Sequence, residues 1–128
     1  MELLLDTQAF LWFSLRDQRL SRRAKDAIEA ADSLLMISPV CFWEIAIKVK
    51  VGKLSVPSSF RDFISEELTA NDILVLPITV DHAAMTLELP FHHKDPFDRM
   101  LVAQSLVEGW PIVSSDGLLD AYGVNRIW

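Results

Sequence analysis

The chain alternates between short apolar runs and longer segments in which apolar residues repeat at helical spacing. The apolar runs have the length of buried strands and are bounded by polar residues or turn signals. They cover residues 3–5, 34–37, 73–76 and 112–113, with a last short strand expected at 125–128. Strands that alternate with helices favour βα units around a parallel sheet. The pattern therefore predicts an α/β fold with a mainly parallel central sheet.

Cap signals predict three helices between these runs. The expected helices cover residues 21–31, 39–52 and 95–109. Ser21 and Asp95 are typical N-cap residues, because their side-chain oxygens accept hydrogen bonds from the first free backbone amides. Pro39 and Pro96 suit the first turn of a helix, and a glycine lies at the end of the second and third segments. These signals fix the helices well enough to place nearby acidic residues on them.

The length and composition predict one domain, covering residues 1–128. The chain has 128 residues, of which 51% are hydrophobic, and it contains no internal repeat, low-complexity tract or Gly/Ser-rich linker. The single cysteine, Cys41, has no partner for an internal disulfide, so nothing points to an oxidising compartment. The first residues lack the basic head of a signal peptide, and no apolar run reaches membrane-spanning length. We therefore expect a cytoplasmic location and no membrane partner.

The charge of the chain argues against non-specific attraction to nucleic acid. The net charge is −6 and the sequence pI is about 4.9. Basic residues nevertheless gather in two clusters, Arg16, Arg19, Arg22, Arg23 and Lys25 in one and Lys48, Lys50 and Lys53 in the other. Such runs are usually solvated helix faces, and contact with an RNA backbone is the alternative.

Two aspartates directly follow candidate strands. Asp6 comes after the run at 3–5, and Asp116 comes after the run at 112–115. Parallel strands point their carboxyl ends to one edge of the sheet, where ligands bind beside the reversal of strand order. If both strands are central, Asp6 and Asp116 share that crevice. The alternative for each is a structural role as the cap of the next helix.

Two further acids lie on predicted helices. Glu44 has apolar neighbours on every side of its helix, so that burying it without a partner would cost free energy. It either pairs with Lys48 one turn later or faces a polar cleft or a metal ion. Asp98 lies three residues beyond the cap Asp95, where the helix dipole by itself favours an acid. These acids become candidate ligands only if the fold brings them together.

A convergent set of carboxylates suits phosphodiester hydrolysis. Hard divalent cations bound by carboxylate oxygens neutralise charge and activate water, and Mg²⁺ or Mn²⁺ fits an oxygen-only ligand set. No cysteine and histidine cluster has zinc spacing. His92 and His93 are adjacent and point apart in regular structure, so we expect a polar loop there, and we expect His82 on a helix surface.

Four segments of the chain resemble the successive motifs of VapC-type toxins of the PIN-domain family. They are residues 3–7 (LLLDT), 42–48 (FWEIAIK), 92–104 (HHKDPFDRMLVAQ) and 113–116 (VSSD). Together they span nearly the whole chain. The second and third segments are the most specific, because an acid after a strand is common in unrelated proteins.

The resemblance implies a three-layer α/β/α PIN-like fold and an endoribonuclease that depends on Mg²⁺ or Mn²⁺ and cleaves RNA through metal-activated water. It also implies a cytoplasmic toxin of a type II toxin–antitoxin system, inhibited by a VapB-like antitoxin and commonly homodimeric. By this resemblance Asp6, Glu44 and Asp98 match the core catalytic and metal-binding acids, and Asp116 matches the fourth. Ser114 or Ser115 stands where the family often has a hydroxyl.

Several assignments stay open at this stage. Asp95 is best explained as a cap, and Arg99 either contacts phosphate or pairs with Asp95. The segment 10–13 (FLWF) is either all core or partly covered by another chain. The sequence does not name the RNA target or the cleavage position.

Other functions are alternatives to the ribonuclease interpretation. The main alternative is a catalytically silent module on the PIN scaffold that binds RNA or has a regulatory role. A haloacid-type hydrolase lacks support because Gln8 replaces the second acid of an Asp-x-Asp pattern. A nucleotide-binding enzyme lacks the glycine-rich phosphate motifs.

Overall fold

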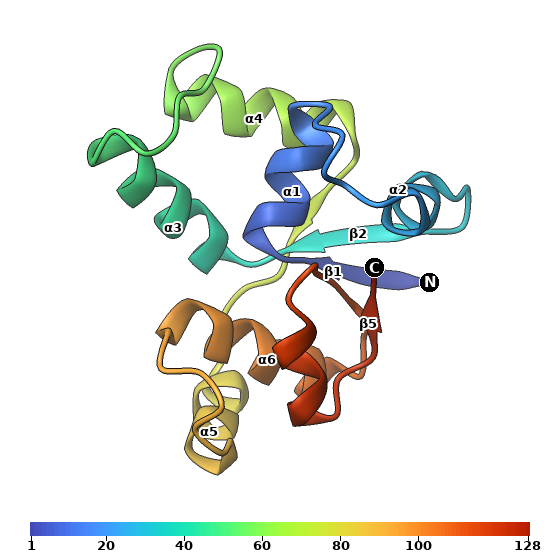
Figure 1. Ribbon diagram of the computed structural model, residues 1–128, viewed down its shortest axis with the longest axis vertical. Coiled ribbons are helices and arrows are strands. Elements are labelled where there is room, and N and C mark those ends of the chain that lie inside the picture. The colour runs from blue at the N-terminus through green and yellow to red at the C-terminus, as the bar shows by residue number, and fades with distance from the viewer.

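A five-stranded parallel sheet forms the centre of the molecule in the computed structural model, which describes residues 1–128 (Figure 1). The strand order is β3-β2-β1-β4-β5, and every neighbouring pair is parallel. The strands are β1 (Glu2–Leu5), β2 (Leu34–Ile37), β3 (Leu74–Val75), β4 (Ile112–Val113) and β5 (Arg126–Ile127). The predicted parallel sheet is therefore confirmed.

Strand β1 lies at the centre of the sheet, and its apolar residues are buried on both faces. Leu4 pairs with Met36 of β2 on one side and with Ile112 of β4 on the other. Leu3, Leu4 and Leu5 are all fully buried, as expected for a parallel strand that helices cover from above and below. The chain order changes direction between β1 and β4. Ligand crevices in open α/β sheets form at such a switch point, outside the carboxyl ends of the strands.

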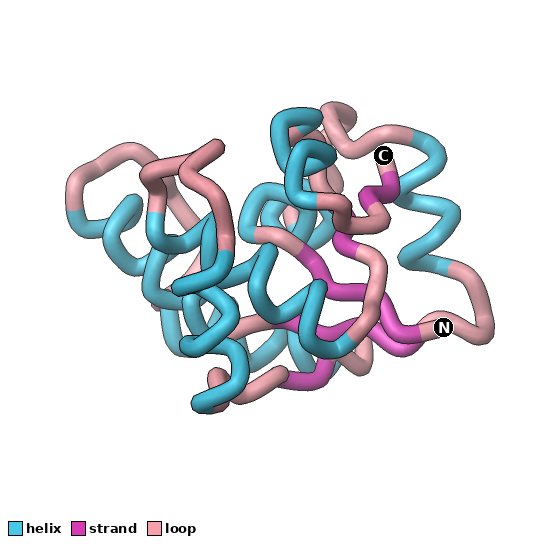
Figure 2. The backbone as a smooth tube through the Cα atoms, turned by 90° about the horizontal axis from the view of Figure 1, so that it is seen from below, coloured by secondary structure: helices cyan, strands magenta, loops and turns pink.

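The helices cover both faces of the sheet. They are α1 (Thr7–Ser14), α2 (Arg22–Glu29), α3 (Pro39–Lys50), α4 (Phe60–Ala70), α5 (Val80–Glu88) and α6 (Pro96–Glu108), with a 3₁₀ helix η1 (Gly117–Tyr122). Figure 1 shows α1, α3 and α4 on one side of the sheet and α5 and α6 on the other. Figure 2 shows the strands enclosed by these helices. The predicted three-layer α/β/α fold is confirmed.

The three helices expected from cap signals are present, with ends within two residues of those predicted. Ser21 and Asp95 accept hydrogen bonds from the backbone amides of Ala24 and Phe97, as N-caps do. Gly109 ends α6 in the left-handed conformation at a φ of 72°, which glycine adopts without steric cost. Local chemistry thus sets where these helices begin and end.

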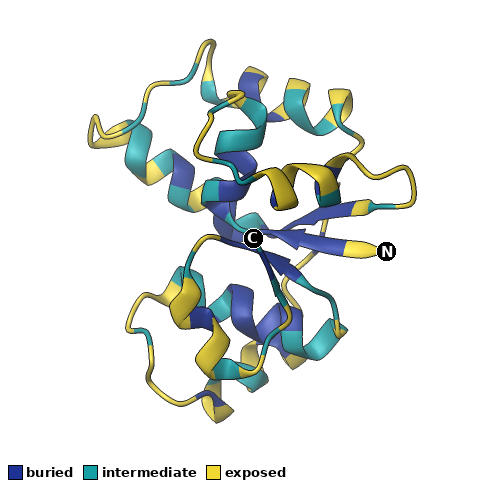
Figure 3. Cartoon of the chain, turned by 45° about the vertical axis from the view of Figure 1, so that its right-hand side comes forward, coloured by how far each residue is buried: buried dark blue, intermediate teal, exposed yellow.

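One apolar core holds the layers together, formed by β1, β2 and β4 and the inner sides of the helices (Figure 3). The core is continuous from Phe10 of α1 through the sheet to Val102 of α6, and both side chains are fully buried. No helix in the structure combines the length and the apolar character needed to cross a bilayer.

The expectation that His82 lies on a helix surface is wrong, because its side chain is fully buried between α5 and α6. Its Nδ1 accepts a hydrogen bond from the Thr79 amide at 3.0 Å, and its Nε2 lies 3.0 Å from a carboxylate oxygen of Glu108. The Thr79 hydroxyl accepts from the His82 amide in return, which completes a capping box. Capping boxes usually carry Glu or Gln at this position, so the sequence signal was weak.

Candidate functional site

Acidic side chains from four separate elements meet at the carboxyl edge of the sheet. They line a pocket of about 180 Å³ together with three small or polar residues and one leucine. The lining residues are Asp6, Thr7, Gln8, Glu44, Asp98, Leu101, Ser115 and Asp116. The structure thus brings all four sequence-predicted acids into one pocket.

Asp6 follows β1 and has two roles at once. One carboxylate oxygen accepts a hydrogen bond from the Ala9 amide at 2.7 Å, so Asp6 caps α1. Burial, with smaller contributions from the charges of Glu44 and Asp116, raises the pKa of Asp6 to about 6, although a hydrogen bond with Ser114 opposes the increase. The structural and functional interpretations of Asp6 are therefore compatible.

Glu44 projects from the first half of α3 into the same pocket. It accepts a hydrogen bond from the Thr7 hydroxyl at 2.6 Å, and Lys48 Nζ lies 3.5 Å from its other oxygen. The Glu44 side chain is about 20% exposed, so Glu44 is neither buried without a partner nor free in solvent. Both alternatives left open by the sequence apply: Glu44 pairs with Lys48 and faces a polar pocket.

Asp98 lies in the first turn of α6 and faces the other acids. Burial raises the pKa of Asp98 to about 6, with smaller contributions from the charges of Asp95, Glu44 and Asp116, while His93 opposes the increase. Asp95 itself is exposed and caps the helix through the Phe97 amide, which confirms its assignment as a cap. Burial and the neighbouring carboxylates thus both disfavour the charged form of Asp98.

Asp116 follows β4 and is held by three neighbours. One oxygen accepts a hydrogen bond from the Leu118 amide at 3.0 Å, and the other lies 2.8 Å from His93 Nε2. The Asp116 amide donates to the Ser114 hydroxyl at 3.1 Å. Ser114 therefore supports the loop that carries Asp116, whereas Ser115 lines the pocket.

Sequence reasoning missed His93 as a site residue. The donor atoms of His93, Asp98 and Asp116 all lie within 4.8 Å of one another. His93 turns inward against Asp116, whereas His92 is exposed, and both rings contact Tyr122. The sequence does not indicate which of the two histidines faces the site, because the loop before α6 has no regular structure from which a side-chain direction could be predicted.

The residues of the pocket fit a hard divalent cation. Carboxylate oxygens are ligands that Mg²⁺ and Mn²⁺ prefer, and burial raises the pKa of two of these carboxyls, Asp6 and Asp98, to about 6. Cys41 lies nearby but is fully buried, which raises the pKa of its thiol to about 12. The thiol thus stays protonated and is excluded as a ligand or nucleophile at neutral pH.

Comparison with known families agrees with these motifs and this geometry. The sequence model of the PIN domain matches residues 3–125, which is nearly the entire chain. The chain belongs to the PIN domain family. The resemblance inferred from the four sequence motifs is thereby confirmed.

The PIN domain described here has a similar relative in Mycobacterium tuberculosis (strain ATCC 25618 / H37Rv), Ribonuclease VapC22. The two are 29% identical over 120 residues, which cover 93% of this chain and 90% of that protein. Among solved structures, VapBC2 from Rickettsia felis bound to a promoter DNA fragment matches with a TM-score of 0.73 and 12% identity, covering 100% of both chains. FitAcB from Neisseria gonorrhoeae matches with a TM-score of 0.64 and 19% sequence identity, covering 97% of this chain and 95% of that one. The two structures support the same fold.

Arg99 of this PIN domain has a different role from the two expected for it, because it is buried beneath the loop that carries His93. Its guanidinium donates hydrogen bonds to the carbonyls of Thr86, Leu89 and Pro90 at 2.9, 3.2 and 2.8 Å. It also stacks on Phe91, with the guanidinium carbon 4.4 Å from the ring centroid. Arg99 therefore neither faces the pocket nor pairs with Asp95, and instead joins the end of α5 to α6.

Replacing Arg99 with methionine is expected to destabilise the fold by about 3 kcal/mol, because three carbonyls lose a charged donor. Chemical denaturation of the purified variant measures this change. Arg61→Met provides the control, since Arg61 is exposed on α4 and has no ion pair. Equal stability of the Arg99 variant and the wild type would contradict the proposed link between α5 and α6.

The raised pKa of Asp98 predicts a pH-dependent stability difference between the metal-free wild type and Asp98→Asn. Because the pKa of Asp98 rises from 3.8 to about 6 on folding, the folded state binds more protons between these values. This contribution to stability is fully present below pH 4 and is lost as the pH rises through 6. In EDTA, the variant should unfold at a higher temperature than the wild type at pH 7.5. The difference in unfolding temperature between the two proteins should disappear towards pH 4. A difference that does not change with pH would contradict the raised pKa of Asp98 as its cause.

Proposed function

We propose that this PIN domain is an Mg²⁺- or Mn²⁺-dependent endoribonuclease and the toxin of a type II, VapBC-like toxin–antitoxin system. The observation that carries the proposal is the meeting of Asp6, Glu44, Asp98 and Asp116 in one pocket, although they lie on separate parts of the chain. Like charges brought together in this way are hard to explain by stability alone. The similarity to Ribonuclease VapC22 supports RNA as the substrate. We further propose that the protein acts in the cytoplasm, where its RNA substrate occurs.

Each proposed site residue would contribute through its carboxylate. Asp6, Glu44, Asp98 and Asp116 would hold the cation, with Asp6 fixed by its cap to α1 and Glu44 by the Thr7 hydroxyl. The bound ion would supply charge neutralisation at the phosphate and lower the pKa of water. Lys48 lies beside Glu44 and would offer its ammonium group to the RNA backbone. No side chain is required as a nucleophile.

Asp6→Asn and Asp98→Asn should each reduce metal-dependent RNA cleavage by at least about 100-fold, because each removes a charged ligand from the cation. Asparagine can still cap α1 at position 6 and has nearly the shape of aspartate at position 98, so both variants should fold. Cleavage is followed on total RNA with Mn²⁺, Mg²⁺ or EDTA, and far-UV circular dichroism checks the fold. Asp72→Asn, an exposed turn residue, serves as the control. Full activity in either variant would remove that residue from the site.

The alternative of a catalytically silent PIN module gives a different result in the same assay. A silent module would bind RNA yet release no fragments with any divalent cation. Cleavage by the wild type that depends on Mn²⁺ or Mg²⁺ and is lost in Asp98→Asn excludes this alternative.

A VapB-like antitoxin is the proposed protein inhibitor. The solved structures of similar fold include VapBC and FitAB assemblies, which supports a partner of this kind. In this chain Phe10 and Leu11 belong to the core, whereas Trp12 and Phe13 are partly exposed and line a groove of about 1020 Å³. The groove also contains three basic residues of the first cluster and four acidic ones: Arg16, Arg22, Lys25, Asp17, Asp26, Glu29 and Glu67. We propose that the antitoxin binds there with an apolar segment that covers Trp12 and Phe13.

The proposed homodimer has a candidate surface on α3. Trp43, Ile47 and Val51 follow one another at intervals of four residues and are 64, 40 and 60% exposed. Such spacing forms one continuous apolar stripe on a helix. The Trp43 ring also packs edge-on against Phe97 of α6, with 5.4 Å between the ring centroids. Pairing two such stripes would bury apolar surface that is otherwise in contact with water.

Replacing Ile47 with glutamate should convert the dimer into a monomer, because it puts a charge in the middle of the stripe. Light scattering coupled to size-exclusion chromatography should show the mass falling to half. Leu34→Glu provides the control, since Leu34 is 42% exposed but lies at the amino end of β2. A monomeric wild type, or a dimeric Ile47 variant, would contradict this surface.

A further inference from the structure

His93 lies between a tyrosine and an acid of the proposed site. Its Nε2 is 2.8 Å from Asp116 Oδ2, and its Nδ1 is 3.1 Å from the Tyr122 hydroxyl. The backbone amide of His93 also donates to that hydroxyl, at 2.8 Å. The imidazole is only 9% exposed, although it belongs to an irregular loop between α5 and α6. This combination of burial and three polar contacts is specific to His93 within the loop.

The contact with Asp116 assigns the hydrogen of the neutral His93 ring to Nε2. A carboxylate oxygen only accepts, so Nε2 carries the hydrogen that is donated to Asp116. Nδ1 is then an acceptor, and the Tyr122 hydroxyl, which already accepts from the His93 amide, has its own hydrogen free to donate to Nδ1. With this arrangement the lone pair of His93 faces Tyr122 rather than the acidic pocket. His93 is therefore not placed to bind a cation directly.

Both oxygens of Asp116 are held by donors that leave room for a cation. The Leu118 amide donates to Oδ1, and His93 donates to Oδ2. Each carboxylate oxygen has two lone pairs, so one on each oxygen stays available. Since Asp116 stands on a loop after a strand of only two residues, these two hydrogen bonds set the direction of its carboxylate.

We propose that His93 is a positioning residue that acts through Asp116 and fixes the orientation of its carboxylate toward the cation. The inference rests on the proposed metal-dependent function and adds a residue to that site. Hydrogen bonds from outside the ligand set commonly orient metal-binding groups, and removing one typically weakens metal affinity or activity 10–100-fold. Tyr122 completes the arrangement by keeping the hydrogen of the ring on Nε2.

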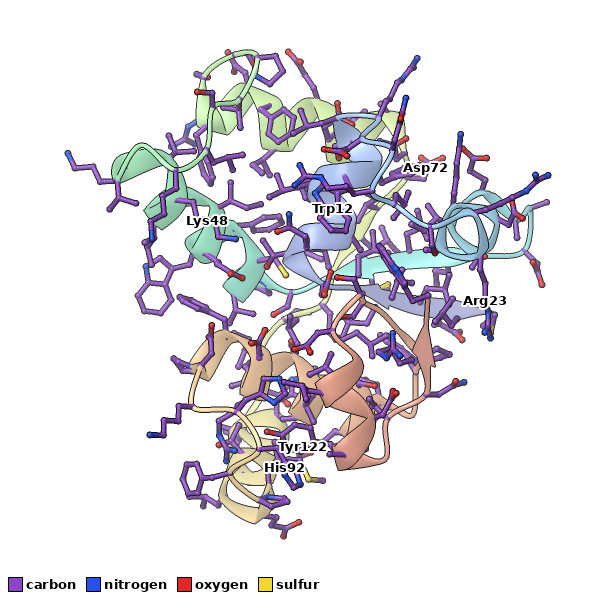
Figure 4. All side chains as sticks on the ribbon, in the orientation of Figure 1. Trp12, Arg23, Lys48, Asp72, His92 and Tyr122 are labelled. Atoms are coloured by element: carbon purple, nitrogen blue, oxygen red, sulfur yellow. The ribbon has the colours of Figure 1, made fainter.

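The surrounding structure holds His93 in place. Arg99 binds the carbonyls of Leu89 and Pro90 just before it, and Asp95 begins α6 two residues after it. His92, in contrast, is exposed and packs edge-on against the Tyr122 ring, with 4.9 Å between the ring centroids (Figure 4). The two adjacent histidines thus share a tyrosine, but only one touches an acid of the site. His92 is therefore a natural control.

The test measures Mn²⁺ binding to the full chain by electron paramagnetic resonance, which does not require RNA cleavage. His93→Ala should weaken Mn²⁺ binding about 10–100-fold. His93→Gln should restore most of the affinity, because its amide N–H replaces the Nε2 donor. His92→Ala should bind Mn²⁺ as the wild type does. Spin-echo spectra of the wild type should show no directly bound nitrogen.

The outcomes separate this inference from the proposed function. If the wild type binds Mn²⁺ and Asp98→Asn does not, the metal site stands whatever His93 does. Unchanged binding by His93→Ala, or failure of His93→Gln to restore binding, would then overturn the positioning role alone. A nitrogen coupling that disappears in His93→Ala would show that His93 is a ligand, which also overturns it. Absence of Mn²⁺ binding by the wild type would overturn the metal-dependent function and this inference with it.

Discussion

Holding carboxylates close together and partly out of water at one edge of the sheet is the constraint on which the rest of the structure depends. Asp6 and Asp98 both have pKa values near 6, because folding moves them out of water and close to other negative groups. A site of this kind opposes folding at neutral pH until positive charge arrives. The fully buried strand β1 and the apolar core around it supply the stability that keeps the acids together.

Two of the four acids in the pocket also have a structural role. Asp6 caps α1 and Asp116 caps η1, so the hydrogen bonds that begin these elements also fix two members of the site. Glu44 is held by Thr7, the first residue of α1, which links α3 to the end of β1. Structural and functional explanations of these residues, which compete when only the sequence is known, therefore describe the same contacts.

The two buried histidines show why similar sequence signals lead to different roles. His82 completes a capping box and contacts Glu108 at the interface between α5 and α6, away from the acidic pocket. His93 contacts Asp116 within the group of donor atoms at the pocket. Both were expected to be polar surface or loop residues, because a histidine in one sequence carries no mark of what it faces. Their partners are 26 and 23 residues away in the chain.

Local chemistry in the sequence was sufficient to predict the parallel sheet and the ends of α2, α3 and α6, and it placed Asp6 and Asp116 at the same edge of the sheet. Glu44 stood out by its apolar surroundings, and Asp98 was assigned to the site by resemblance to the PIN-domain family. The predictions from local chemistry rest on interactions between residues close in the chain, such as the caps at Ser21 and Asp95, and on the rule that parallel strands end at one edge. The inward turn of His93, the burial of His82 and the carbonyl contacts of Arg99 were decided only by the tertiary structure. Each depends on partners from other elements, and the direction of a side chain in an irregular loop follows from packing rather than from spacing.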